Sequence, residues 1–243
     1  MDTTGKSNLC LSKKHVKMTK LCKMVAAAML LMTGNATAQQ AEQLYTVKAG
    51  DATMTVNAAG GGKILSLKYK DQEVINQSRW PESFGSTFWT SPQKEWNWPP
   101  VQEFDKRPYT VEQESPTLAM SSEVSERQKF RGRKEFATDP ADGAFVITYS
   151  IVNEGDTSRS VAPWEITRVP NEGIIFFDAP VDAITPAGVM PFKEVAGVAC
   201  YETDEAPQNR KVNGDGQGWL AYCSDGLLLV KQFEDLVAGQ PAP

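Results

Sequence analysis

The chain beyond residue 40 has no stretch with the helical repeat of apolar residues, and this constrains its fold more than any other feature. Apolar side chains recur instead at every second position or in short runs bounded by turn residues. We predict strands over 64–69, 73–75, 118–124, 128–136, 144–153, 159–169, 173–177, 219–222 and 226–231. Ten or so short strands of this kind indicate an all-β antiparallel sandwich.

Two connections in this pattern stand out. Residues 153–156 are predicted to turn the chain after 144–153, so that 159–169 returns. Residues 76–109, rich in Trp, Pro and Ser, form the one long irregular stretch. A loop of that length in a compact domain is usually functional.

The N-terminal residues have the layout of a secretory signal peptide. Lys20 and Lys23 precede a nine-residue apolar run over 24–32, and the small-residue pattern 36–38 follows it. The run is too short for a membrane span, which needs roughly 20 residues. We therefore expect residues 1–38 to be a signal peptide, with Met18 a candidate initiator. The expected mature protein is periplasmic or secreted in a bacterium, has no membrane span, and forms one β-sandwich domain over 39–243.

Charge and histidine content exclude several functions. The whole chain has 25 basic and 30 acidic residues; residues 1–38 hold six of the Lys and one of the acids, Asp2. The remainder has 19 basic and 29 acidic residues, a net charge of −10. A surface that acidic repels nucleic acid. The only histidine, His15, lies in the leader, so the mature chain has no histidine for acid/base catalysis or metal binding.

Two cysteines remain after residue 38, Cys200 and Cys223. In an oxidising compartment they are candidates for a disulfide. The alternative is two separate buried thiols, and the sequence does not decide between them.

Four of the six tryptophans lie within residues 80–98. Tryptophan rings stack on the apolar faces of sugars, while neighbouring polar side chains bond hydroxyl groups. The alternative is a hydrophobic flap that closes one end of the sandwich. The candidate ligand-binding residues in this segment are Trp89, Lys94, Trp96 and Trp98, with Trp80 at its start.

The second candidate cluster lies in 163–168. Strand alternation places Trp164 and Arg168 on one face and Glu165 on the other. Trp and Arg on one face are suited to holding a sugar or a carboxylate. The alternative is a core Trp beside a surface ion pair.

Three further motifs favour plain structural roles. Residues 60–63 lack the features of a phosphate loop and are predicted to be a turn. Residues 213–218 begin like a calcium loop, but the twelfth position is Ser224, so a hairpin loop is favoured. The acidic residues near 202–205 are expected to form a solvated loop. The sequence indicates no cofactor and no metal site.

Three segments together resemble a known family. Residues 61–67, 85–93 and 162–168 are similar to an uncharacterised exported bacterial family in the galactose-mutarotase-like (aldose 1-epimerase-like) superfamily. The resemblance implies an antiparallel β-supersandwich with a concave groove facing carbohydrate. Similar members continue with further strands, so we expect this chain to be truncated at its C-terminus.

The departures from that superfamily concern catalysis. Mutarotases use a histidine as general acid and a late glutamate as general base. The mature chain has no histidine, and a late glutamate would fall beyond Pro243. The resemblance therefore implies sugar-directed architecture more than epimerase chemistry.

Three functions follow as hypotheses. The leading one is an exported carbohydrate-binding protein with a Trp-lined groove. The second is a sugar epimerase or polysaccharide-acting enzyme, with Glu95 and Glu165 as the candidate carboxylate pair. The third is a structural or interaction module that docks through an edge after Lys231.

Overall fold

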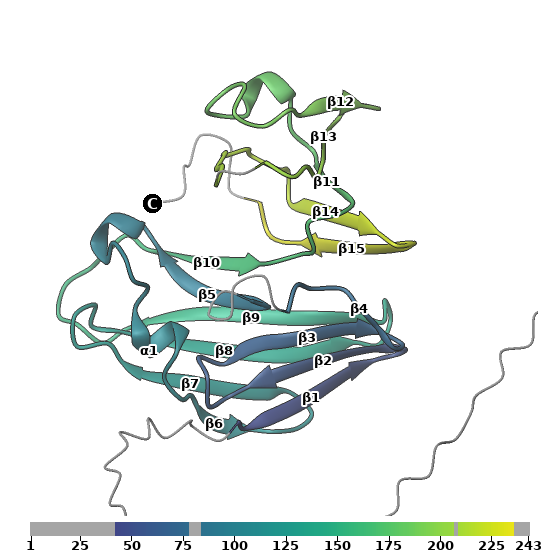
Figure 1. The fold of residues 1–243 in the computed structure, drawn as a ribbon. Coiled ribbons are helices and arrows are strands. Elements are labelled where there is room, and N and C mark those ends of the chain that lie inside the picture. The colour runs from purple at the N-terminus through teal and green to yellow at the C-terminus, as the bar shows by residue number, and fades with distance from the viewer. Residues whose placement is uncertain (1–41, 78–83, 207–208, 236–243) are drawn as a thin grey trace, which may run out of the picture. The chain divides into compact units, whose positions relative to one another are not determined.

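A computed structural model describes residues 42–77, 84–206 and 209–235. The described residues belong to one compact unit, Gln40–Pro243. They form three antiparallel sheets and three short helical turns. Figure 1 shows how the strands are arranged. The all-β prediction is confirmed. The helical turns are η1 (Gln93–Glu95), α1 (Gln102–Asp105) and η2 (Val181–Ala183).

The first two sheets lie against each other. The first has the order β1-β2-β3-β5-β10, with β4 paired to β3; its strands are β1 (Leu44–Ala49), β2 (Ala52–Asn57), β3 (Lys63–Tyr69), β4 (Gln72–Glu73), β5 (Ser86–Ser91) and β10 (Ala162–Thr167). The second has the order β6-β7-β8-β9; its strands are β6 (Thr110–Gln113), β7 (Leu118–Val124), β8 (Phe130–Asp139) and β9 (Ala144–Asn153).

The core between these sheets draws on both of them. Met54 and Val56 of β2 pack with Met120 of β7 and Phe136 of β8, and all four are buried. The alternation of buried and half-buried residues along β8 follows from the two-residue side-chain period of a strand, which directs every second side chain inward.

The third sheet has the order β12-β13-β11-β14-β15. Its strands are β11 (Ile174–Phe177), β12 (Lys193–Val195), β13 (Val198–Glu202), β14 (Trp219–Ser224) and β15 (Leu227–Gln232). It joins the sandwich through β15, which lies near β10 in Figure 1. Leu229 packs against the main core, and the Lys231 ammonium pairs with the Glu165 carboxylate of β10.

Three predicted connections are corrected by the structure. β10 follows β9 in the chain but pairs with β5 of the other sheet. The segment 76–109 is not irregular throughout, because it contains β5 and two short helical turns. Residues 213–218 do not close a hairpin, since β13 and β14 both pair with β11 and not with each other.

The glycine turn before β3 is a turn, as predicted, and it supports α1. Gly61 has a positive φ of 71°, and a Cβ there would lie 2.1 Å from the carbonyl oxygen of Asp105. Only glycine permits this approach. The buried Lys134 side chain of β8 donates hydrogen bonds from Nζ to the carbonyl oxygens of Gly61 (2.7 Å) and Gly62 (3.1 Å).

Lys134, at 1% exposed, is the most deeply buried charged side chain among the described residues. Its Nζ lies 4.7 Å from the centre of the Tyr109 ring and 5.4 Å from that of Phe88. Burial lowers the pKa of Lys134 from 10.5 to about 7, because desolvation disfavours the ammonium form. The ammonium is thus a structural group of the core with an unusual titration range.

Candidate functional site

The β5–β10 pair places two of the predicted tryptophans opposite each other. Trp164 of β10 is the register partner of Trp89 of β5, so both side chains lie on the same face of the pair. Arg168 follows β10 on this face, with its guanidinium carbon 5.9 Å from the centre of the Trp89 ring. The other face carries Phe88, which packs in the core with Phe104 and Phe130.

Four tryptophan rings meet on this face, and we call them the Trp cluster: Trp89, Trp96, Trp98 and Trp164. Trp89 is at its centre, with ring centroids 5.7 Å from Trp96, 5.9 Å from Trp98 and 5.5 Å from Trp164, all edge to face. Edge-to-face packing is a favoured arrangement of aromatic rings. Trp98 is 66% exposed, whereas Trp89 and Trp164 are half-buried.

Trp96 is part of the protein interior and does not offer a face to a ligand. It is only 2% exposed, and its Nε1–H donates to the Thr90 carbonyl oxygen at 2.8 Å. The Arg127 guanidinium bonds the Trp96 carbonyl oxygen at 3.2 Å. The structure therefore uses the Trp96 ring in packing, which argues against its predicted role as a ligand contact. Lys94, in η1, is exposed, and Trp80 lies outside the described residues.

Two cationic side chains, Arg168 and Lys211, lie close to rings of the Trp cluster. Besides Arg168, the Lys211 ammonium lies 4.9 Å from the centre of the Trp164 ring. Arg168 donates to the Thr87 hydroxyl at 3.2 Å, and neither cation forms an ion pair with any residue that the structure describes. Partial burial lowers the pKa of Arg168 below its ordinary value, although the carboxylates of Asp105 and Glu165 oppose that shift. A guanidinium with so few partners has donors left for an anion.

Two residues of this site were not predicted from the sequence. Asp105 of α1 is buried and accepts a hydrogen bond from Trp89 Nε1 at 2.8 Å, which fixes the orientation of the central ring. Lys211 reaches Trp164 from the connection between β13 and β14. Both contacts depend on tertiary structure, and no local sequence pattern signals either one.

The carboxylate pair proposed for catalysis is not formed. Glu165 lies on the opposite face from Trp164, where it accepts hydrogen bonds from Ser86 and Thr167 and pairs with Lys231. Glu95 pairs instead with the Arg159 guanidinium. Each carboxylate has its own cation, so the structure does not bring Glu95 and Glu165 together for acid/base work.

The proposed disulfide is not formed either. Cys200 and Cys223 are free thiols, each half-buried. β11 lies between their strands, so the two strands are two strand spacings apart, roughly 9–10 Å, and the cysteines are also offset by two residues along the strands. The Cα atoms of a disulfide are usually no more than about 7 Å apart. The alternative of two separate thiols is the one that the structure contains.

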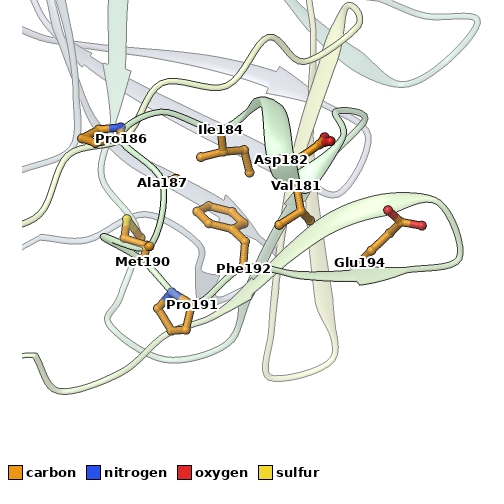
Figure 2. A pocket seen from close by; sticks show the side chains of 10 residues that line it. Val181, Asp182, Ile184, Pro186, Ala187, Met190, Pro191, Phe192 and Glu194 are labelled. Carbon is orange, nitrogen blue, oxygen red and sulfur yellow. The ribbon is translucent and has the colours of Figure 1, made fainter.

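A hollow of about 600 Å³ opens elsewhere, in the segment between β11 and β13 (Figure 2). None of the predicted site residues lines it. Within the described ranges, no group of three His, Cys, Asp or Glu side chains gathers as a metal ion would require. The same ranges contain no helix with the length and apolar character that crossing a membrane demands.

Comparison with known proteins gives no assignment, since no protein-family model, no curated protein and no solved structure matches this chain. The function therefore has to be argued from the chemistry of the site. The Trp cluster with Arg168 and Lys211 is the place where the described residues combine exposed aromatic surface with unpaired cations.

Proposed function

We propose that this protein is an exported carbohydrate-binding protein whose site is the Trp cluster, and that its sugar carries a carboxylate. The single observation that carries the proposal is the meeting of Trp98, Trp89 and Trp164 with Arg168 and Lys211 on one face of the β5–β10 pair. The signal peptide predicted over residues 1–38 would account for export to the periplasm or the medium.

The aromatic part of the site accounts for sugar as the ligand class. Trp98 is 66% exposed, and a large exposed apolar ring is unfavourable in water unless a ligand covers it. The C–H face of a pyranose ring is a suitable cover. Trp89 supports Trp98 edge to face, and the bond from Trp89 to Asp105 keeps that support rigid.

The two cations, Arg168 and Lys211, are the reason for proposing that the sugar carries a carboxylate. Arg168 and Lys211 have no ion-pair partner among the described residues, and a sugar acid would supply one. Hydrogen bonds to charged groups contribute about 1.5–3 kcal/mol, which corresponds to roughly 10- to 100-fold in affinity. Glu165, which lies on the other face, is assigned to the framework instead of the ligand.

The proposal includes membership of the galactose-mutarotase-like superfamily. The observed antiparallel sheets and the position of β10 beside β5 are compatible with a supersandwich. The enzyme alternative loses its proposed acid/base pair, because Glu95 and Glu165 are paired with different cations.

An interaction module is the second candidate, and one observation favours it. β15 is an edge strand of the third sheet, and its Leu228 and Val230 are 58% and 47% exposed. Such an edge can accept a strand from a partner. A protein partner that protects β15 from hydrogen exchange would support this function.

The test is calorimetric titration of the purified protein with galacturonate and glucuronate oligomers and with their neutral galactose and glucose counterparts. We expect saturable binding of an acidic oligomer, at least tenfold weaker binding of its neutral counterpart, and loss of binding in Trp98→Ala. Trp219→Ala is the matched control, because Trp219 packs on Phe176 in the third sheet. Absence of binding by every sugar, or equal binding by Trp98→Ala and the parent protein, would overturn the proposal.

A further inference from the structure

The hollow between β11 and β13 is a second place where a ligand fits. Its volume of about 600 Å³ lies within the range of small-molecule sites. Most of its lining is apolar, and the rest consists of two carboxylates. The lining residues are Val181, Asp182, Ile184, Pro186, Ala187, Gly188, Met190, Pro191, Phe192 and Glu194.

Phe192 is the centre of the hollow. In Figure 2 its ring lies between Val181 and Ile184 on one side and Met190 and Pro191 on the other. The ring also packs against Phe177 and Tyr201, at centroid distances of 5.7 and 5.5 Å. The aromatic ring is therefore held in place before any ligand arrives.

The wall of the hollow is also anchored to the third sheet. Thr185 and Asn213 exchange two backbone hydrogen bonds, of 2.9 and 2.7 Å, which tie the segment after η2 to the connection before β14. Behind Phe177, Gly214 is so close that a Cβ there would lie 2.6 Å from the Phe177 ring. Phe177, which packs on Phe192, therefore leaves no space for a side chain at position 214.

The charge of the hollow has one sign. Asp182 and Glu194 are exposed and lie at the same end of the hollow in Figure 2. Neither forms an ion pair with a residue in the described part of the chain, and no Lys or Arg lines the hollow. Lys193, next to Glu194, belongs to the opposite face of β12, because neighbouring side chains of a strand alternate.

We propose that this hollow binds an organic ammonium ion with an apolar body. The apolar body would cover Phe192 and the aliphatic walls, and the ammonium would lie at the end that holds Asp182 and Glu194. An ammonium beside two carboxylates is favoured electrostatically, and partial exclusion of water strengthens this attraction. None of the residues of the Trp cluster takes part, so this site does not depend on the sugar-binding proposal.

The experiment compares three probes of the same chain length by NMR titration of the purified full chain: hexylammonium, 1-hexanol and hexanoate. We expect hexylammonium to shift the amide signals around Phe192 in a saturable manner, 1-hexanol to bind at least tenfold more weakly, and hexanoate not to bind. Raising NaCl to 0.5 M should weaken hexylammonium binding severalfold and leave 1-hexanol unchanged.

The variants separate the carboxylates from the apolar walls. Asp182→Asn with Glu194→Gln should weaken hexylammonium binding at least tenfold and leave 1-hexanol binding as it is. Glu202→Gln is the matched control, since Glu202 is an exposed carboxylate outside the lining of the hollow. Equal affinities for hexylammonium and 1-hexanol, or a double variant that binds hexylammonium like the parent protein, would overturn the proposal. The salt titration tests the same point on the unmodified chain, whatever the variants do.

Discussion

Trp96 and Trp98 are two residues apart and belong to the same cluster, yet their replacement by alanine should have opposite consequences. Trp96 is 2% exposed, so truncation removes nearly all of a buried surface of roughly 150–250 Å². Large aromatic residues that are cut to alanine in a core cost about 3–5 kcal/mol. The buried Thr90 carbonyl oxygen also loses its donor, the Trp96 Nε1–H.

Trp98, by contrast, is 66% exposed and contacts Trp89 at one edge. An aromatic pair of this kind contributes about 0.5–1.5 kcal/mol. In a domain of this size 1 kcal/mol corresponds to about 2–4 °C in Tm. We therefore expect Trp96→Ala to lower Tm by about 6–20 °C and Trp98→Ala by about 1–6 °C.

The assay is thermal unfolding followed by far-UV circular dichroism, because the loss of a tryptophan changes the fluorescence signal itself. Sugar titration of the same samples supplies the second readout. Trp96→Ala should bind sugar in proportion to its folded fraction, whereas Trp98→Ala should stay folded and lose binding. Equal, small losses of Tm in the two variants would refute the assignment of Trp96 to the core.

Two further predictions concern titration and redox state. Burial lowers the pKa of Lys134 in the folded state from 10.5 to about 7. Between these two pH values the unfolded chain therefore binds more protons than the folded chain. The free energy of unfolding should accordingly rise from pH 7 to about pH 9.5. Lys134→Met should abolish this rise in the free energy of unfolding, measured by urea unfolding at each pH. A variant whose free energy of unfolding rises with pH as in the parent protein would contradict the prediction. Burial raises the pKa of Tyr109 and Tyr149, which reduces stability only above about pH 10 and so leaves this range unaffected. Cys200 and Cys223 should both react with iodoacetamide in denaturant without prior reduction, as read by peptide mass spectrometry, and a reductant should leave Tm unchanged. A Cys200–Cys223 cross-linked peptide would contradict the free-thiol assignment.

Strands with strong local patterns could be predicted from the sequence, and their pairing could not. The residues 144–153 and 118–124 form β9 and β7 with the predicted bounds, since alternation and β-branched residues are local properties. β1 and β2 were not among the predicted strands. The pairing of β10 with β5 was missed because nothing in 159–169 distinguishes a return within one sheet from a crossing to the other.

The residue types of the candidate site could be predicted from the sequence, but their burial and their partners could not. The sequence alone determined that the region contains many tryptophans, that the chain beyond residue 38 has no histidine, and that Trp164 and Glu165 occupy neighbouring positions of a strand. Tertiary structure alone decided that Trp96 turns inward, that Lys211 stands over Trp164, and that Lys231 and Arg159 pair with Glu165 and Glu95. The physical reason is that residue type and two-residue alternation are local, whereas burial and charge pairing depend on which distant strand lies opposite.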